Sequence, residues 1–181
     1  MFEQDDLEAA GRLFAIVGPP VSETDIHTVF TGQFPGKEDL VQFYLHYNGG
    51  SRTPQGCVIS CRNPAHKVAR HAMEKMNVEG FMSVSLDLED RMLPFRPILV
   101  HYATMRQIYE EVPEMKEFLQ QNIPFAFDHT GNDLCIDLNS GCVRFLDWTE
   151  YGKGAIEISS SFREFVLKYW VSAEFSCGQH S

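Results

Sequence analysis

The stretch IPFAFDHTGNDLCIDLNSGCVRFLDW, from Ile123 to Trp148, decides the fold of this chain. It contains three short apolar runs, 123–128, 133–138 and 141–147. The runs are separated by HTGN and NSG, and both of these sequences favour tight hairpin turns. The pattern therefore predicts a three-stranded antiparallel meander.

Apolar and polar residues alternate along these strands, which predicts that the sheet has two different faces. The face expected to point into the core carries Phe125, Phe127, Leu134, Ile136, Val143 and Phe145. The opposite face carries mainly Ala126, Asp128, Asp133, Asp137 and Arg144. We therefore expect an exposed, acidic face on this sheet.

The rest of the chain adds helices and a few strands around the meander. We predict helices over 3–15, after Ser22 as N-cap, over 35–47 with Leu40, Phe43, Tyr44 and Tyr47 buried, over 104–111 and over 114–121. A last helix is predicted from Ser159, where Ser159, Ser160 or Ser161 can cap it and Phe162, Phe165, Val166 and Tyr169 are buried. Further strands are predicted over 56–60, 97–102 and 155–158, whereas 62–95 has no decisive period. No linker, repeat or low-complexity segment divides the chain, so we predict a single α+β domain over 1–181.

The charge of the chain limits its partners. Its 181 residues include 15 Lys and Arg against 25 Asp and Glu, a formal net charge of −10. This balance argues against nucleic acid as a ligand, because such binding needs clustered basic residues. A basic partner protein fits better, although solubility alone also explains a mildly acidic chain. The excess of acidic residues is concentrated between Ile108 and Glu150, a stretch that contains nine acidic and two basic residues.

Targeting signals and cysteines indicate a cytoplasmic protein. The first residues carry acids and no basic segment before an apolar run, and no apolar stretch approaches the roughly 18 residues that span a bilayer. We therefore expect no membrane partner. The five cysteines are an odd number in such a chain, so no disulfide framework is expected.

Motifs of the common enzyme classes are absent from the sequence. It contains no nucleophile elbow, phosphate loop or dinucleotide-binding glycine pattern. Cys57 and Cys61 lack a second Cys or His pair at zinc-finger spacing. The acids around 128–137 suit a cation site superficially, but turn chemistry explains them better because the D-x-D-x-D-G calcium pattern is missing. We therefore expect no enzyme activity, metal or cofactor.

Trp148 is the most informative aromatic residue in the acidic stretch. It follows Asp147 and precedes Glu150, and an exposed aromatic residue among acids is a good binding hot spot for a basic partner. Packing in the core is the other interpretation. Our candidate partner-binding residues are Asp128, Asp133, Asp137, Asp147, Trp148 and Glu150.

Three features in this order resemble the SUKH superfamily, which includes fungal Smi/Knr regulators of cell-wall synthesis and many bacterial toxin-immunity proteins. They are the Pro35–Gly50 helix that ends in Asn-Gly-Gly, the meander, and the helix sequence ISSSFREFVLKY. The resemblance centres on 22–172. Its matched positions are structural: Asn48, Gly49, Gly50, Gly131, Asn132, Asp137, Gly141, Phe162 and Phe165. The chain departs from the compact family pattern over 51–121.

The resemblance implies a sheet flanked by helices that binds another protein and has no catalytic residues. We expect an immunity protein that neutralises a cognate toxin domain with a basic surface. A regulatory scaffold that binds an endogenous partner is the alternative. We expect a monomer or weak dimer.

Overall fold

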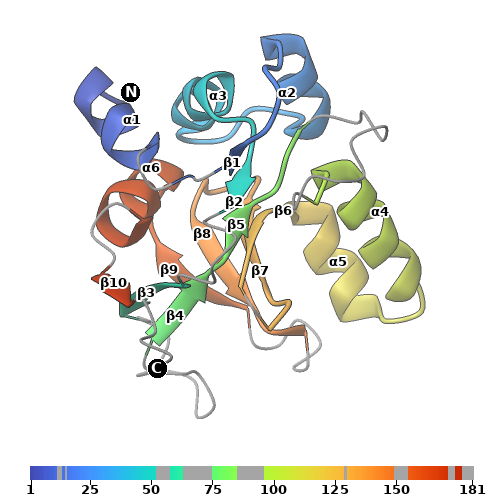
Figure 1. Cartoon of the computed structure of the whole chain (residues 1–181). Coiled ribbons are helices and arrows are strands. Elements are labelled where there is room, and N and C mark those ends of the chain that lie inside the picture. The colour runs from blue at the N-terminus through green and yellow to red at the C-terminus, as the bar shows by residue number, and fades with distance from the viewer. Residues whose placement is uncertain are drawn as a thin grey trace.

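A seven-stranded antiparallel sheet forms the centre of the structure, a computed structural model shown in Figure 1. The structure describes residues 1–11, 14, 16–51, 58–62, 75–84, 96–128, 130–148, 155–170 and 174–176. The strands lie side by side in the order β1 (Ile16–Val17), β2 (Gly50–Ser51), β5 (Gly80–Phe81), β6 (Asn122–Phe127), β7 (Asp133–Asp137), β8 (Val143–Leu146) and β9 (Ile156–Ser159). The predicted α+β class with a C-terminal antiparallel meander is confirmed.

The meander lies where the sequence predicts it, with β6, β7 and β8 paired in sequence order. Ile123 lies opposite Ile136, and Cys135 lies opposite Arg144. The β6–β7 register shifts between Pro124 and Ala126. Since proline has no N–H to donate, an irregularity at this point of the ladder is expected. β9 adds a further antiparallel strand beside β8, as predicted.

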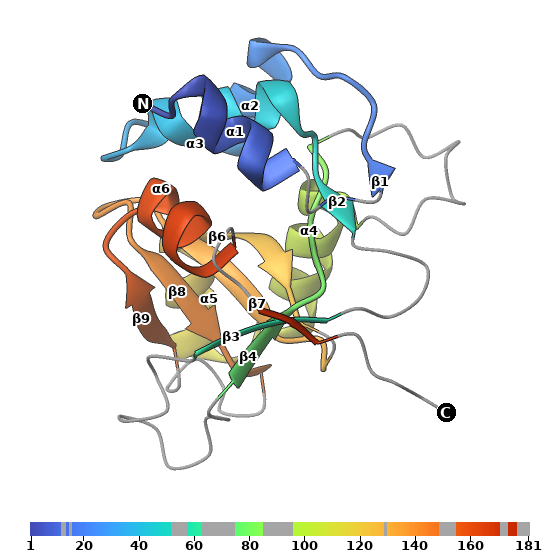
Figure 2. The same cartoon turned by 60° about the vertical axis from the view of Figure 1, so that its left-hand side comes forward.

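Helices cover both faces of this sheet. On one face lie α6 (Phe162–Phe165) and the π-helical turn Val166–Trp170, and on the other lie α4 (Ile98–Ile108) and α5 (Pro113–Gln121) (Figure 2). The remaining helices of the described chain, α1 (Gln4–Gly11), α2 (Glu23–Val29) and α3 (Lys37–His46), group at one end of the sheet (Figure 1). Of these, α1 and α3 lie next to α6 and its π-helical turn. A second sheet has the order β10 (Glu174–Ser176), β3 (Val58–Arg62) and β4 (Lys75–Val78).

Aromatic side chains dominate the core between α3, α6 and the sheet. The centroid of the Phe43 ring lies 5.2 Å from the ring centroids of both Phe81 and Phe162. Tyr44 is fully buried, and its hydroxyl donates to the carbonyls of Met82 and Phe125 at 3.2 and 3.4 Å. Leu40, Phe43 and Tyr44 of the predicted stripe are buried, whereas Tyr47 is the C-cap of α3 and is only partly buried. The contacts of Phe43 and Tyr44 join α3 to the central strands.

The Asn-Gly-Gly sequence after α3 ties three segments together. Asn48 is buried, and its Nδ2 donates to the carbonyl of Pro19 at 2.8 Å. Its Oδ1 accepts the N–H of Val84 at 2.7 Å. Gly49 has φ +70°, and a Cβ there would come within 2.8 Å of the Met82 backbone. Gly49 can therefore adopt a left-handed conformation and lie directly against the backbone of Met82, as only a glycine can without strain.

The helix caps also follow the sequence. Ser22 and Asp25 form a capping box at the start of α2, which buries Ile26 and Val29 as predicted. The Ser161 hydroxyl accepts the N–H of Glu164 at the start of α6. Each cap satisfies donors that the first helical turn leaves without an internal partner.

The predicted strand over 97–102 is wrong, because these residues form the first turns of α4. A short apolar run does not by itself distinguish a strand from a buried helix. Pro97 suits the N-cap, where no helical N–H is needed. The helix that begins at Ile98 continues without a break to Ile108. Residues 58–60 of the strand predicted over 56–60 lie in β3, which continues to Arg62, and residues 56–57 lie outside the described residues.

No helix in the described part of the chain combines the length and apolar character needed to cross a membrane.

Candidate functional site

The second face of the meander is covered, not exposed. Every residue of β6 and β7 is buried, because α4 and α5 pack against the face that carries Asp133 and Asp137. A small second core lies under these helices and includes Met115, Cys135 and Leu146. The expectation of an exposed acidic face on this sheet is therefore wrong. Alternation correctly separates the two faces but does not reveal that helices cover both.

Asp128 holds together the hairpin between β6 and β7. Its Oδ1 accepts the backbone N–H groups of Thr130 and Asn132 at 2.8 and 2.9 Å. The Thr130 hydroxyl donates to the same carboxylate at 2.7 Å. The residue is only 4% exposed. This is the turn chemistry that the sequence favours over a cation site, and it leaves Asp128 little surface for a partner.

Asp137 performs the same role at the next turn. Its Oδ1 accepts the N–H groups of Asn139 and Ser140 at 2.8 and 2.9 Å, and its Oδ2 lies 2.8 Å from Nη2 of Arg144. Burial opposes ionisation, but these donors and the guanidinium outweigh it and hold the pKa of Asp137 below its usual value. The carboxylate is thus committed to the turn and to β8.

Asp133 lies under α4 and is completely buried. Its Oδ2 lies 2.6 Å from Nε2 of His101, whose side chain is 9% exposed. Burial is the largest influence on the pKa of Asp133 and raises it above its ordinary value. The hydrogen bond and charge of His101 act against this rise, followed by Arg96 and the indole N–H of Trp148.

Trp148 closes over this pair from the end of β8. Its ring stacks on Tyr109 with 5.1 Å between centroids and lies edge-on to His101 at 6.4 Å. The indole N–H is near enough to Asp133 to help lower its pKa, but within the described residues neither Nε1 of Trp148 nor Oδ1 of Asp133 meets the geometry of a hydrogen bond. The indole is partly buried in the second core, so both interpretations of Trp148 keep some support.

Two further candidates have different outcomes. Asp147 is half-buried beside Trp148 and stays a predicted contact residue. Glu150 lies outside the described residues, as does His129 of the hairpin.

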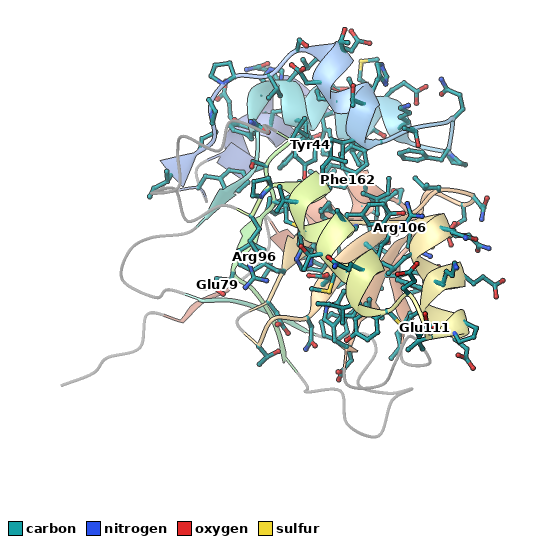
Figure 3. All side chains as sticks on the ribbon, turned by 90° about the vertical axis from the view of Figure 1, so that its right-hand side faces the viewer. Tyr44, Glu79, Arg96, Arg106, Glu111 and Phe162 are labelled. Atoms are coloured by element: carbon teal, nitrogen blue, oxygen red, sulfur yellow. The ribbon has the colours of Figure 1, made fainter. Side chains whose placement is uncertain are left out.

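The exposed negative charge of this region lies on the helices instead. Glu110 and Glu111 in the α4–α5 turn are exposed, and so are Glu114 and Glu117 of α5 (Figure 3 labels Glu111). The sequence locates the acidic excess between 108 and 150 but assigns its exposed part to the wrong element. Helical spacing over 110–117 is the signal that distinguishes these residues from those of the strands.

The described residues offer little for catalysis. Among them, no three His, Cys, Asp or Glu side chains gather closely enough to hold a metal ion. Cys135 lies two residues from Asp133 on the same strand face, but burial raises the pKa of its thiol well above the usual value. A neutral, buried thiol is a poor nucleophile. The His101–Asp133 pair thus has no activated nucleophile in Cys135.

A shallow cavity of about 200 Å³ lies between α2 and the start of α4. Its lining includes the apolar residues Val21, Val29, Val84 and Leu99. Asp25 is its carboxylate, and that group already accepts the N–H and hydroxyl of Ser22 at 2.9 and 2.6 Å. The carboxylate of Asp25 already caps α2, so the cavity offers a ligand no carboxylate that lacks a hydrogen-bond partner.

Comparison with known proteins identifies the family. Neither a search of curated proteins nor a search of solved structures found a match. A family model described as SMI1 / KNR4 family (SUKH-1) matches residues 36–168, which include α3, the whole meander and α6. Because this match spans well over half of the sequence, the chain belongs to the SMI1 / KNR4 (SUKH-1) family.

Proposed function

We propose that this chain is a non-enzymatic protein-binding module, and specifically an immunity protein that neutralises a cognate toxin by direct binding in the cytoplasm. Family membership carries the proposal, since the SUKH group that the sequence resembles includes many immunity proteins. The buried carboxylates have structural roles. Asp128 and Asp137 are engaged with turn and strand partners, and Asp133 with His101, so they maintain the fold.

The charge of the chain supports a partner with a basic surface. The net charge is −10, and exposed acids gather at the α4–α5 turn and along α5. Complementary charge speeds the encounter of two proteins and selects among partners. A toxin that binds a polyanionic substrate needs a basic cleft, and such a cleft would complement these exposed acids. Asp147 and Trp148 lie beside the α4 end and remain proposed contact residues.

The experiment begins with capture of the tagged chain from its native cells at low and moderate salt, and partners are identified by mass spectrometry. Each recovered partner is then expressed in a sensitive host with and without this chain. An immunity protein is expected to restore growth that the partner alone arrests. A recovered partner that does not arrest growth supports the regulatory scaffold instead. Failure to recover any specific protein contradicts both forms of the proposal.

A further inference from the structure

The outward side of α4 carries an exposed apolar ridge. Val100, Thr104 and Ile108 follow one another at intervals of four residues, so they line up along one side of this 11-residue helix. Val100 is 41% exposed and Ile108 is 60% exposed. Among the described large apolar residues, only the terminal Met1 is more exposed than Ile108. We call these three residues the α4 ridge.

The surroundings of the ridge resemble the layout of a protein interface. Ala103 and Gln107 lie next to it on the helix and are exposed and uncharged. Glu110 and Glu111 follow directly at its C-terminal end, and both are exposed. An apolar centre with a charged border is the usual anatomy of a binding surface. Arg106, which Figure 3 labels, lies on another side of the helix. Its guanidinium is 5.7 Å from the centre of the Tyr102 ring.

The helix that carries the ridge is held firmly from below. His101 bonds to Asp133, the Tyr102 hydroxyl donates to the carbonyl of Leu119, and Tyr109 stacks on Trp148. These contacts fix α4 to β7, to α5 and to the end of β8. A surface that is already ordered loses less entropy when it binds than a flexible one. The ridge is therefore a pre-organised surface.

Charge decides which occupant fits. A second copy of this chain would bring Glu110 and Glu111 toward a border of the same sign, which opposes association. Nucleic acid would bring phosphates to the same acids. A protein with an apolar contact patch bordered by Lys or Arg matches both the ridge and its border.

We propose that the α4 ridge is the docking surface for the protein partner, and that this partner meets it with an apolar patch bordered by basic residues. The inference rests on the proposed function, since it specifies where that function takes place. Ile108 supplies the apolar anchor, and Glu110 and Glu111 guide the basic border into place.

Site-specific photo-crosslinking tests this inference in the full-length chain. The photoreactive residue p-benzoylphenylalanine replaces Ile108 in one variant and Leu45 in the control. Leu45 is a matched position because it is also an exposed apolar residue on a helix, 43% exposed on α3. The cells are irradiated, and adducts are identified by mass spectrometry and compared with the partner captured by the wild-type chain.

The inference predicts an adduct with that partner from position 108 and none from position 45. The partner's crosslinked peptide should be apolar, with Lys or Arg close to it on the partner's surface. An adduct from position 45, from both positions or from neither would contradict docking at the ridge, while wild-type capture would leave the proposed function standing. If the wild-type chain captures no protein, the proposed function fails and the docking surface fails with it.

Discussion

His101 of α4 and Asp133 of β7 form a hydrogen-bonded pair across the interface between helix and sheet, with Nε2 2.6 Å from Oδ2. The two residues are 32 positions apart in the sequence. The Asp133 side chain is fully buried, and the His101 side chain is 9% exposed. The pair fastens α4 over the sheet face that would otherwise expose Asp133. A buried carboxylate needs such a partner, because an unpaired charge in the interior is strongly unfavourable.

Loss of the donor in this pair should destabilise the fold. We expect His101→Gln to lower the free energy of unfolding by about 3 kcal/mol at pH 7, because it leaves Asp133 buried with a weaker partner. Urea unfolding followed by circular dichroism measures the change. The control is His27→Gln, which alters an exposed His–Glu pair on α2 with 3.2 Å between Nε2 and Oε1. Equal effects of the two substitutions would contradict the role given to His101.

The pH dependence of Asp133 can be isolated in the His101→Gln background. Burial raises the pKa of Asp133 above 3.8, and without His101 the pKa should rise further. The stability that Asp133 contributes is therefore complete below pH 3.8 and is lost as pH rises through its folded-state pKa. Adding Asp133→Asn should thus stabilise this background at pH 7, and the gain should fade toward pH 4. A gain that does not vary with pH would contradict an ionised, buried Asp133.

Asp137 should behave in the opposite way. Burial opposes its ionisation, but the N–H donors of Ser140 and Asn139 and the charge of Arg144 lower its pKa below 3.8. Its stabilising contribution is therefore present above pH 3.8 and is lost as pH falls through the folded-state pKa. We expect Asp137→Asn to reduce stability by about 1–2 kcal/mol at pH 7, and this loss should shrink only below about pH 4. Urea unfolding at several pH values gives both results, and a loss that shrinks already between pH 7 and 5 would contradict the lowered pKa.

Two glycines of the meander provide a matched comparison. Gly131 and Gly141 both have positive φ, +88° and +72°. A Cβ at Gly131 would meet open space, whereas a Cβ at Gly141 would collide with the carbonyl oxygen of Pro35. Gly131→Ala should therefore reduce stability by about 1 kcal/mol, for backbone strain alone. Gly141→Ala adds the collision and should cost about 3 kcal/mol. Thermal unfolding distinguishes the two, and equal losses would show that the turn does not press against the start of α3.

Charge reversal at the α4 end should slow partner binding. We expect Glu110→Lys with Glu111→Lys to lower the association rate constant about tenfold at low salt, because attraction to a basic partner becomes repulsion. Added salt should reduce the difference. The control is Glu3→Lys with Glu8→Lys, an equal charge change at exposed positions at the start of the chain. Surface plasmon resonance with the captured partner measures both rates, and equal slowing by the two double variants would point to net charge alone.

Local patterns in the sequence predict most of the fold. The meander, the buried stripe of α3 and the Ser22 cap all depend on turn chemistry, periodicity or capping, which act within a few residues. The segment 97–102 fails because its side chains are apolar enough for either a strand or a helix. The single domain over 1–181 stays a prediction, although Phe2 packs in the same core as Phe162 of the matched segment.

The candidate site was harder to predict than the fold. Alternation correctly puts Asp133 and Asp137 on the face opposite the main core, but only the tertiary structure shows α4 and α5 covering them. His101, which bonds to Oδ2 of Asp133, comes from a helix whose local sequence contains no sign of the contact. Conversely, the exposure of Ile108 depends on how α4 is rotated on the sheet, which no local pattern specifies.

The central claim is that this family member binds a protein partner through the outward side of α4. The most direct measurement is the dissociation constant of the captured complex, determined by isothermal titration calorimetry for the wild-type chain, Ile108→Asp and Leu45→Asp. We predict that Ile108→Asp weakens binding at least about tenfold, as loss of an interface anchor does, and that Leu45→Asp leaves binding unchanged. Wild-type affinity in the Ile108→Asp variant would contradict the claim.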